Sequence, residues 1–203
     1  MAGFTNKTIG GFRYWGSVFG ENIVPRLLER QVASAYGTAV FCGDPVNCVS
    51  DGSVDVAAAG QAIWGVVARC QYNKSGKLEE SNHIPASTTY TQDYLRSQAH
   101  CIAATPYTIF EVDADEGTSI TTVAAARELI WENCDHATGT GDTVSGRSAA
   151  VLDISTHGTG AAGWRIIGIS DATPNNVTVT RAKYLVVANE TDAWPGTFST
   201  TGV

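Results

Sequence analysis

The sequence has no long apolar run and no dense cluster of positive charge. No apolar stretch approaches the roughly 20 residues that a transmembrane helix requires, and the first residues show no basic region followed by an apolar one, as secretory signals do. Thirteen Lys and Arg stand against twenty Asp and Glu, for a formal charge of −7. Because phosphate affinity depends on clustered positive side chains, we expect neither a membrane nor a nucleic acid among its partners.

The cysteines also lack any metal-binding pattern. Their spacing contains no CxxC pair and no zinc-type arrangement. An odd number of cysteines without a signal peptide is typical of reduced thiols in a cytoplasm, where the chain is expected to be made. The five residues are Cys42, Cys48, Cys70, Cys101 and Cys134.

What is abundant is short β-branched runs separated by turn residues. Twenty-one glycines with frequent Thr, Val and Ala favour strands and turns over long helices. The stretch 37–68 predicts four strands in a compact hairpin ladder, because each break carries residues suited to tight turns. The four predicted strands are Thr38–Phe41, Val46–Val49, Val54–Val56 and Ile63–Val67.

The rest of the chain continues the same pattern with one exception. Residues 71–80 predict a polar loop around Ser75 and Gly76, and residues 139–146 a flexible connection. Apolar residues at helical spacing predict a single α-helix over about 121–134. Further strands are predicted at Ser87–Thr91, Ala99–Ala103, Ile109–Val112, Ala149–Ser155, Trp164–Ile169 and Tyr184–Ala188.

These elements predict a mainly β protein, a compact β-barrel or β-sandwich body with one helix. We expect an N-terminal arm over 1–30, a single β-rich body over 31–190 and a C-terminal tail over 191–203. The first thirty residues follow neither strand nor helix periodicity. Two interpretations remain open: a segment that wraps the protein's own core, and an arm that docks on a neighbouring subunit. Enrichment of aromatic residues at interfaces favours the arm, with Phe12, Tyr14, Trp15, Phe19 and Trp194 as candidate interface residues.

Three patterns resemble sites for a cofactor or metal but fail on their context. The segment 158–163 matches GxGxxG, yet a strand rather than a helix is predicted after it, so no helix N-terminus would receive a phosphate. The acidic run that begins at Asp113 has no glycine at the sixth position of a calcium loop. Cys134 and His136 have no second ligand pair for zinc. We therefore expect no metal and no cofactor.

The alternating residues Asp153, Ser155 and His157 contain the side chains of a hydrolase triad. On one strand, however, they would project in parallel, about 6–7 Å apart, whereas a nucleophile and its base must point at each other. No nucleophile-elbow GxSxG occurs in the chain. A solvated polar face is the better interpretation, and we expect no enzyme.

The ladder GDPVNCVSDGSVDVAAAGQAIWGVV resembles the head-decoration, or capsid cement, proteins of tailed bacteriophages. The segments that begin at Pro85, Phe110 and Leu152 are similar to parts of longer virion proteins, and the resemblance covers about residues 31–190. It implies a β-rich body, often trimeric, that binds the major capsid protein on the outside of the capsid. No catalytic residue is implied.

The resemblance therefore suggests a structural virion protein that clamps neighbouring capsid subunits. The alternative from a different class is a phage tail knob that binds a receptor or glycan, since such modules are also β-rich and expose Trp and Tyr. For this chain the strand and helix patterns around Trp64, Trp131 and Trp164 predict burial of those side chains.

Overall fold

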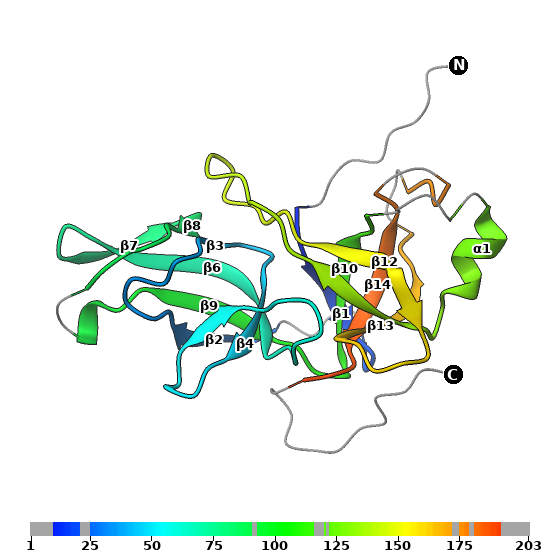
Figure 1. Cartoon of the computed structure of the whole chain (residues 1–203), viewed down its shortest axis with the longest axis horizontal. Helices are drawn as coiled ribbons and strands as arrows, with labels where there is room; N and C mark the ends of the chain where they lie inside the picture. Colours follow the sequence, from blue (N-terminus) through cyan, green and yellow to red (C-terminus); the bar gives the residue numbers. More distant parts are fainter. Residues whose placement is uncertain are drawn as a thin grey trace.

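A computed structural model describes residues 10–20, 25–90, 93–115, 120, 122–171, 175–178 and 181–191. The described chain is mainly β, as predicted, with antiparallel sheets and one short α-helix. Two β-rich lobes lie side by side (Figure 1). The first lobe contains β2–β9, and the second contains β1 together with β10–β14 and α1. The described chain therefore starts in the second lobe with β1, continues through the first lobe, and ends in the second lobe.

The first lobe is built on a five-stranded sheet with the order β2-β9-β6-β4-β5, and β7 pairs with the far end of β6. A two-stranded ribbon of β3 and β8 lies beside it. The bounds are β2 Leu27–Gln31, β3 Val40–Phe41, β4 Pro45–Cys48, β5 Val54–Val56, β6 Gly65–Lys74, β7 Lys77–Ser81, β8 His83–Ile84 and β9 Gln98–Ala103, with a 3₁₀ turn at Asp93–Leu95.

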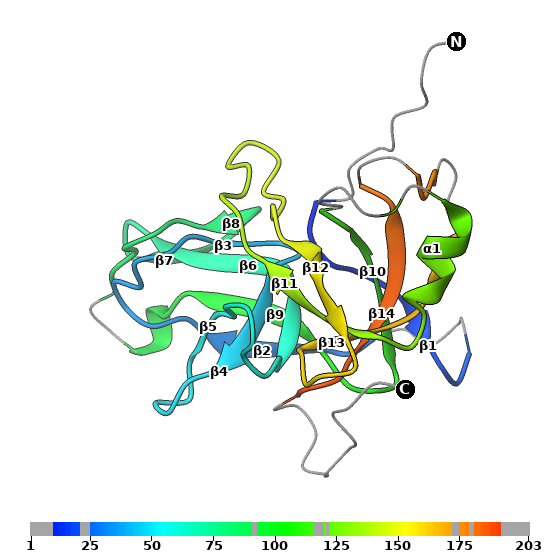
Figure 2. The same ribbon diagram turned by 45° about the vertical axis from the view of Figure 1, so that its right-hand side comes forward.

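The second lobe is a six-stranded sheet with the order β1-β10-β14-β13-β11-β12. The sheet curls, and β12 returns to the end of β10 through a parallel bridge between Leu152 and Ala114. Helix α1 lies against the outside of this lobe (Figure 2). The bounds are β1 Arg13–Ser17, β10 Thr108–Asp113, α1 Val123–Glu128, β11 Asn133–Ala137, β12 Val151–Gly158, β13 Trp164–Ile169 and β14 Lys183–Ala188.

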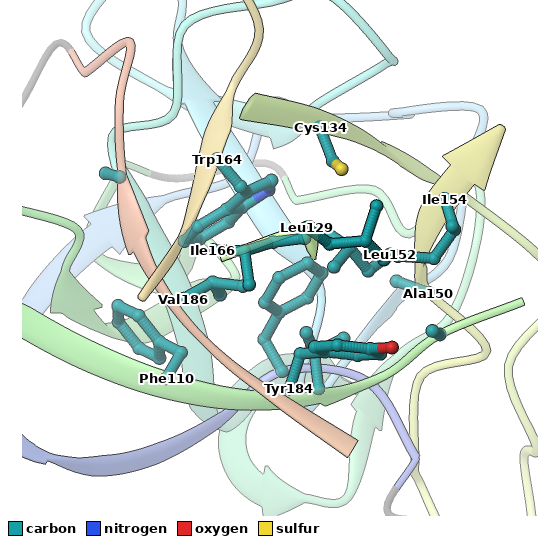
Figure 3. Close-up of a cluster of buried hydrophobic side chains, with 14 of the residues drawn as sticks. Phe110, Leu129, Cys134, Ala150, Leu152, Ile154, Trp164, Ile166, Tyr184 and Val186 are labelled. Atoms are coloured by element: carbon teal, nitrogen blue, oxygen red, sulfur yellow. The ribbon is translucent and has the colours of Figure 1, made fainter. Parts of the chain in front are cut away.

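One large apolar core fills the second lobe and extends into the first. Trp164, Ile166 and Tyr184 converge on Leu152 in its interior (Figure 3). The same cluster takes in Ala57, Ile63, Val66, Ile102 and Ala104 from the first lobe. A second cluster inside the first lobe is centred on Val46, Val67 and Cys70. Because the larger cluster draws on both lobes, their packing is continuous.

The predicted ladder is present with one change of partner. The second, third and fourth predicted strands correspond to β4, β5 and β6, which pair in one sheet, with the turn at Asp51 and Gly52 where it was predicted. The first, β3, pairs instead with β8. Strand β6 also runs on to Lys74, so the predicted polar loop is a hairpin of β6 and β7 that turns at Ser75 and Gly76. Residues 87–90 form no strand.

The predicted helix over 121–134 is about half as long as expected. Thr122 caps its start, since its Oγ1 accepts a hydrogen bond from the Ala125 N–H at 3.1 Å. The helix ends near Leu129, because Trp131 has a φ of +79° and donates its N–H to the Ile166 carbonyl at 2.7 Å. The chain then enters β11, which pairs with both β12 and β13.

Candidate functional site

The N-terminal aromatic residues predicted to form an interface lie in different environments. Phe12 is only 3% exposed and stacks on Trp164, with ring centroids 4.3 Å apart. It is a core residue and cannot anchor a partner. Tyr14 is half-buried and packs against the same cluster, and Trp15 is half-buried. Trp194 lies outside the described residues, as do 1–9, 21–24 and the tail from 192.

The described part of the predicted arm is therefore built into the sheets. Strand β1 pairs with β10, and β2 pairs with β9 along its whole length. The side chain of Arg13 on β1 donates to Glu111 on β10, and Glu111 also accepts from Ser170. Glu111 is fully buried. A buried carboxylate needs such partners, so this ion pair fixes β1 on the body.

Phe19 is the one predicted interface residue that the structure places on an open surface. Its exposed fraction is 72%, and the preceding Val18 is 50% exposed. The ring of Phe19 lies against Tyr107, with centroids 5.0 Å apart. We call Val18, Phe19 and Tyr107 the apolar tip. It lies where β1 ends and β10 begins.

Backbone hydrogen bonds hold the apolar tip in place. The Val18 N–H donates to the Tyr107 carbonyl at 3.0 Å, and the Gly20 N–H donates to the Ser17 carbonyl at 3.0 Å. Strand β1 is the outer strand of its sheet, and within the described ranges only β10 pairs with it. Apolar side chains presented on an ordered turn lose little conformational entropy on binding. The apolar tip is therefore suited to contact another protein surface.

Other large apolar side chains are exposed on separate turns. Tyr94 in the first lobe is 73% exposed, and Trp131 in the second is 53% exposed. The prediction that Trp131 is buried is thus wrong, while Trp64 and Trp164 are buried as predicted. A positive φ is uncommon for a bulky residue, and at Trp131 it belongs to the turn that follows the helix.

The segment predicted to be a flexible connection is an ordered loop with Val144 at its end, 87% exposed. Asp142 organises the turn, since its carboxylate accepts the Val144 N–H at 2.9 Å and the Ser145 hydroxyl at 2.7 Å. Asn82 of the first lobe donates its side-chain amide to the Val144 carbonyl at 2.9 Å. Asp142 could have indicated this ordered turn from the sequence, because an Asp side chain commonly accepts a hydrogen bond from the backbone N–H two residues later.

The side chains of the hydrolase-like pattern form no triad, although Asp153 and Ser155 approach each other more closely than predicted. The Ser155 hydroxyl donates to Asp153 Oδ1 at 2.5 Å, while His157 Nδ1 lies 2.5 Å from Glu132 Oε2. Serine and histidine therefore engage different carboxylates on an exposed face. The GxGxxG segment forms the turn between β12 and β13, as predicted.

Cys134 and His136 belong to the core. Both are fully buried, and burial raises the pKa of the Cys134 thiol to about 12. The Nε2 of His136 donates to the Ala57 carbonyl of the other lobe at 2.8 Å. No group of three His, Cys, Asp or Glu within the described ranges is arranged to hold a metal ion. Nor is any helix of the described chain long and apolar enough to cross a membrane.

A cleft of about 250 Å³ lies beside the ordered loop, between it and Gly10–Gly11. Arg147 and Arg181 line it together with the carboxylate of Asp142. Arg181 also lies 3.9 Å from the buried carboxylate of Asp113. Asp142 in the lining and the buried Asp113 behind it partly offset the two arginines, and we assign no ligand to the cleft.

Comparison with known proteins finds no relative of this chain. The chain matches no protein-family model, no curated protein and no solved structure. Its function must therefore be argued from its residues and their geometry, of which the apolar tip is the most distinctive surface feature.

Proposed function

We propose that this chain is a structural virion protein that binds the outer surface of a phage capsid and cements neighbouring major capsid protein subunits. It would assemble in the host cytoplasm and act on the capsid exterior as a homo-oligomer, with a trimer favoured. The observation that carries the proposal is the apolar tip, with Phe19 72% exposed on a backbone-bonded turn. The resemblance of the ladder to capsid cement proteins supports the same function.

The arrangement of exposed apolar residues suits multivalent binding. The apolar tip and Val144 project from separate turns of a body whose two lobes share a core. Each contact can be weak, because a subunit that touches several capsid proteins gains from effective concentration. Cyclic oligomerisation would multiply the contacts further. A rigid β body with several small contacts is what a clamp between neighbouring subunits requires.

The sharpest test changes the apolar tip without disturbing the core. Deleting the first twenty residues would remove Phe12 and β1 and so unfold the second lobe. The substitution Phe19→Ser instead removes an exposed ring, and we expect it to weaken binding to expanded, undecorated capsids at least about tenfold, from the apolar area no longer buried. Co-sedimentation with purified capsids measures this.

The matched control is Tyr94→Ser, which also removes an exposed aromatic side chain but leaves the apolar tip unchanged. Tyr94 is as exposed as Phe19, at 73%, but lies in the other lobe. If the wild type and the Phe19→Ser variant bind capsids equally well, the apolar tip is not the capsid-binding surface. If the wild-type protein does not bind capsids at all, the proposed function itself is wrong.

The exposed Trp131 favours a second candidate function, a tail knob that binds a glycan. An indole that is 53% exposed offers a flat apolar face on which a sugar ring can stack. If the protein is such a knob, adding host-surface polysaccharide is expected to change the tryptophan fluorescence of the wild type but not that of the Trp131→Ala variant. Location on the particle separates the functions: many copies over the head lattice indicate cement, and a few copies at the tail indicate the knob.

A further inference from the structure

Two thiols of the first lobe lie within hydrogen-bonding reach of each other. Cys42 directly follows β3 and is half-buried, and Cys70 lies in β6 and is fully buried. The Cys42 Sγ lies 3.5 Å from the Asn82 carbonyl oxygen, and Cys70 pairs in register with the neighbouring Ser81, so the two cysteines come together although they are far apart in the sequence. All five cysteines are in the thiol form in this structure.

Backbone contacts hold the two segments side by side. The Gly43 N–H, next to Cys42, donates to the Val67 carbonyl of β6 at 2.7 Å, and the Val67 N–H donates back to the Asp44 carbonyl at 3.0 Å. The Cys70 Sγ also lies 3.7 Å from the Val40 carbonyl oxygen. The proximity of the two cysteines is thus a consequence of sheet packing.

We propose that Cys42 and Cys70 form an intramolecular disulfide when the folded protein meets a small disulfide oxidant such as oxidised glutathione. The pair is a site of covalent modification that converts a dithiol form of the protein into a cross-linked one. The proposal rests on the geometry of the first lobe and does not depend on the function proposed above.

The chemistry proceeds by two thiol–disulfide exchanges. The Cys42 thiolate attacks one sulfur of oxidised glutathione, forming a mixed disulfide and releasing one glutathione thiolate. The sulfur of Cys70, after losing its proton, then attacks the Cys42 sulfur and releases the second glutathione. The two protein thiols are oxidised by two electrons in total, and one glutathione disulfide is reduced to two glutathione thiols.

The environments of the two sulfurs assign these roles. Cys42 is half-buried and so accessible to the oxidant, whereas Cys70 is enclosed. The hydrogen bond from Cys70 lowers the pKa of Cys42, which increases its thiolate fraction. The same hydrogen bond, together with burial, raises the pKa of Cys70. Cys42 is therefore the attacking thiol and Cys70 the resolving thiol.

The cross-link would join elements that the ordered loop also touches. It closes the chain between β3 and β6, around the hairpin of β4 and β5. The Cys42 N–H donates to the Gly146 carbonyl at 3.0 Å, so the loop that presents Val144 rests on the cross-linked segment. Constraining the unfolded chain is expected to raise the midpoint of thermal unfolding by about 5–10 °C.

The test incubates the full chain, purified under reducing conditions, with a glutathione buffer rich in the oxidised form. Acid quenching and alkylation of the remaining thiols then precede peptide mapping by mass spectrometry. We expect a peptide pair joined through Cys42 and Cys70, a monomer on a non-reducing gel, and the rise in the unfolding midpoint. Cys48→Ser, which removes an exposed cysteine of the same lobe, is expected to behave as the wild type.

Cys42→Ser is expected to lose both the joined peptides and the thermal shift. Because peptide mapping is done on the wild type, the test does not depend on whether a variant at the buried Cys70 folds. Three results would overturn the proposal: alkylation of both Cys42 and Cys70 after oxidation, a glutathione adduct that persists on Cys42, or Cys42 joined to a different cysteine.

Discussion

Phe12 stacks on Trp164 with ring centroids 4.3 Å apart and an interplanar angle of 20°. The contact brings the start of the described chain onto the strand β13, and Phe110 packs edge-on against the same indole. Both Phe12 and Trp164 are buried. The first described residues are therefore a structural part of the second lobe, and only the end of β1 with its apolar tip is left for contact with a partner.

Phe12 and Phe19 should differ sharply in their contribution to stability. Phe12→Ala removes a buried ring from the stack and is expected to lower the free energy of unfolding by about 3–5 kcal/mol. Phe19→Ala changes an exposed side chain and is expected to stay within about 0.5 kcal/mol of the wild type. Urea unfolding followed by tryptophan fluorescence measures both. Similar losses for the two variants would contradict the assignment of Phe12 to the core and Phe19 to the surface.

Gly146 is expected to be sensitive to substitution because it combines a positive φ with a close contact. Its φ is +70°, and a Cβ there would lie 2.3 Å from the Cβ of Asn82. Gly146→Ala should cost about 2–4 kcal/mol, from backbone strain and overpacking together. Gly52 has a φ of +85° with nothing within 4 Å of an added Cβ. Gly52→Ala, the control for strain alone, should cost about 1–2 kcal/mol.

Thermal unfolding of the two glycine variants, measured side by side, tests this difference. An equal loss at both positions would show that the ordered loop yields to the added methyl group, and that its contact with Asn82 is not tight.

Asp44 should make the protein less stable as the pH rises from about 4 to about 6. Burial raises the pKa of its carboxyl from 3.8 to about 6, while the Phe41 N–H donates to it at 2.7 Å. Between these two pKa values the folded state holds a proton that the unfolded chain has released, so the free energy of unfolding falls with rising pH. The loss, about 1–3 kcal/mol, is complete above the folded pKa.

The variant Asp44→Asn tests this effect, because it stays neutral and keeps a carbonyl oxygen for the Phe41 N–H. Relative to the wild type, its free energy of unfolding should be higher at pH 7 than at pH 4, because the variant does not lose the stability that the wild type loses. Asp142→Asn should shift in the opposite sense, because hydrogen bonds from Ser145 and Val144 lower the pKa of that carboxyl. A difference between Asp44→Asn and the wild type that is constant with pH would contradict the prediction.

His136 should contribute a separate loss of stability in acid. Burial lowers its pKa below the ordinary 6.5, and the ring stays neutral while Nε2 donates to the Ala57 carbonyl. As the pH falls through 6.5 the unfolded chain takes up a proton that the folded state does not, so the free energy of unfolding decreases.

Glutamine can donate a similar hydrogen bond without titrating. His136→Gln is therefore expected to lower stability at neutral pH and to remove this part of the acid dependence. Denaturant unfolding of variant and wild type at pH 7 and pH 5 measures it. If their difference does not narrow toward pH 5, the histidine is not held neutral in the fold.

Local pattern predicted most of the strands. Trp164–Ile169 coincides with β13, and Val54–Val56 with β5, because β-branched residues bounded by turn residues favour extended backbone wherever they pack. The helix was predicted too long for an equally local reason. Apolar spacing continued through Ile130 to Cys134, but pairing of β11 with β12 and β13 outweighed it. A strand between two partners gains backbone hydrogen bonds that helical spacing cannot reveal.

The candidate site was less predictable than the fold. Phe12 and Phe19 look alike in the sequence, as aromatic residues among glycines, and their difference depends on Trp164 and Tyr107, which are remote along the chain. The same holds for the thiol pair, since Cys42 and Cys70 meet only when β3 lies against β6. Contacts between distant segments depend on the register of sheets, which a single sequence does not state.

The sequence by itself determined a mainly β chain with its turns at Asp51–Gly52 and Ser75–Gly76, because turn residues and β-branched runs act locally. Only the tertiary structure decided that β1 belongs to the second lobe, that Phe12 is buried, and that Phe19 is exposed. The physical reason is burial: whether an aromatic ring becomes core or surface depends on which apolar faces close over it, and those faces come from elements at the other end of the chain.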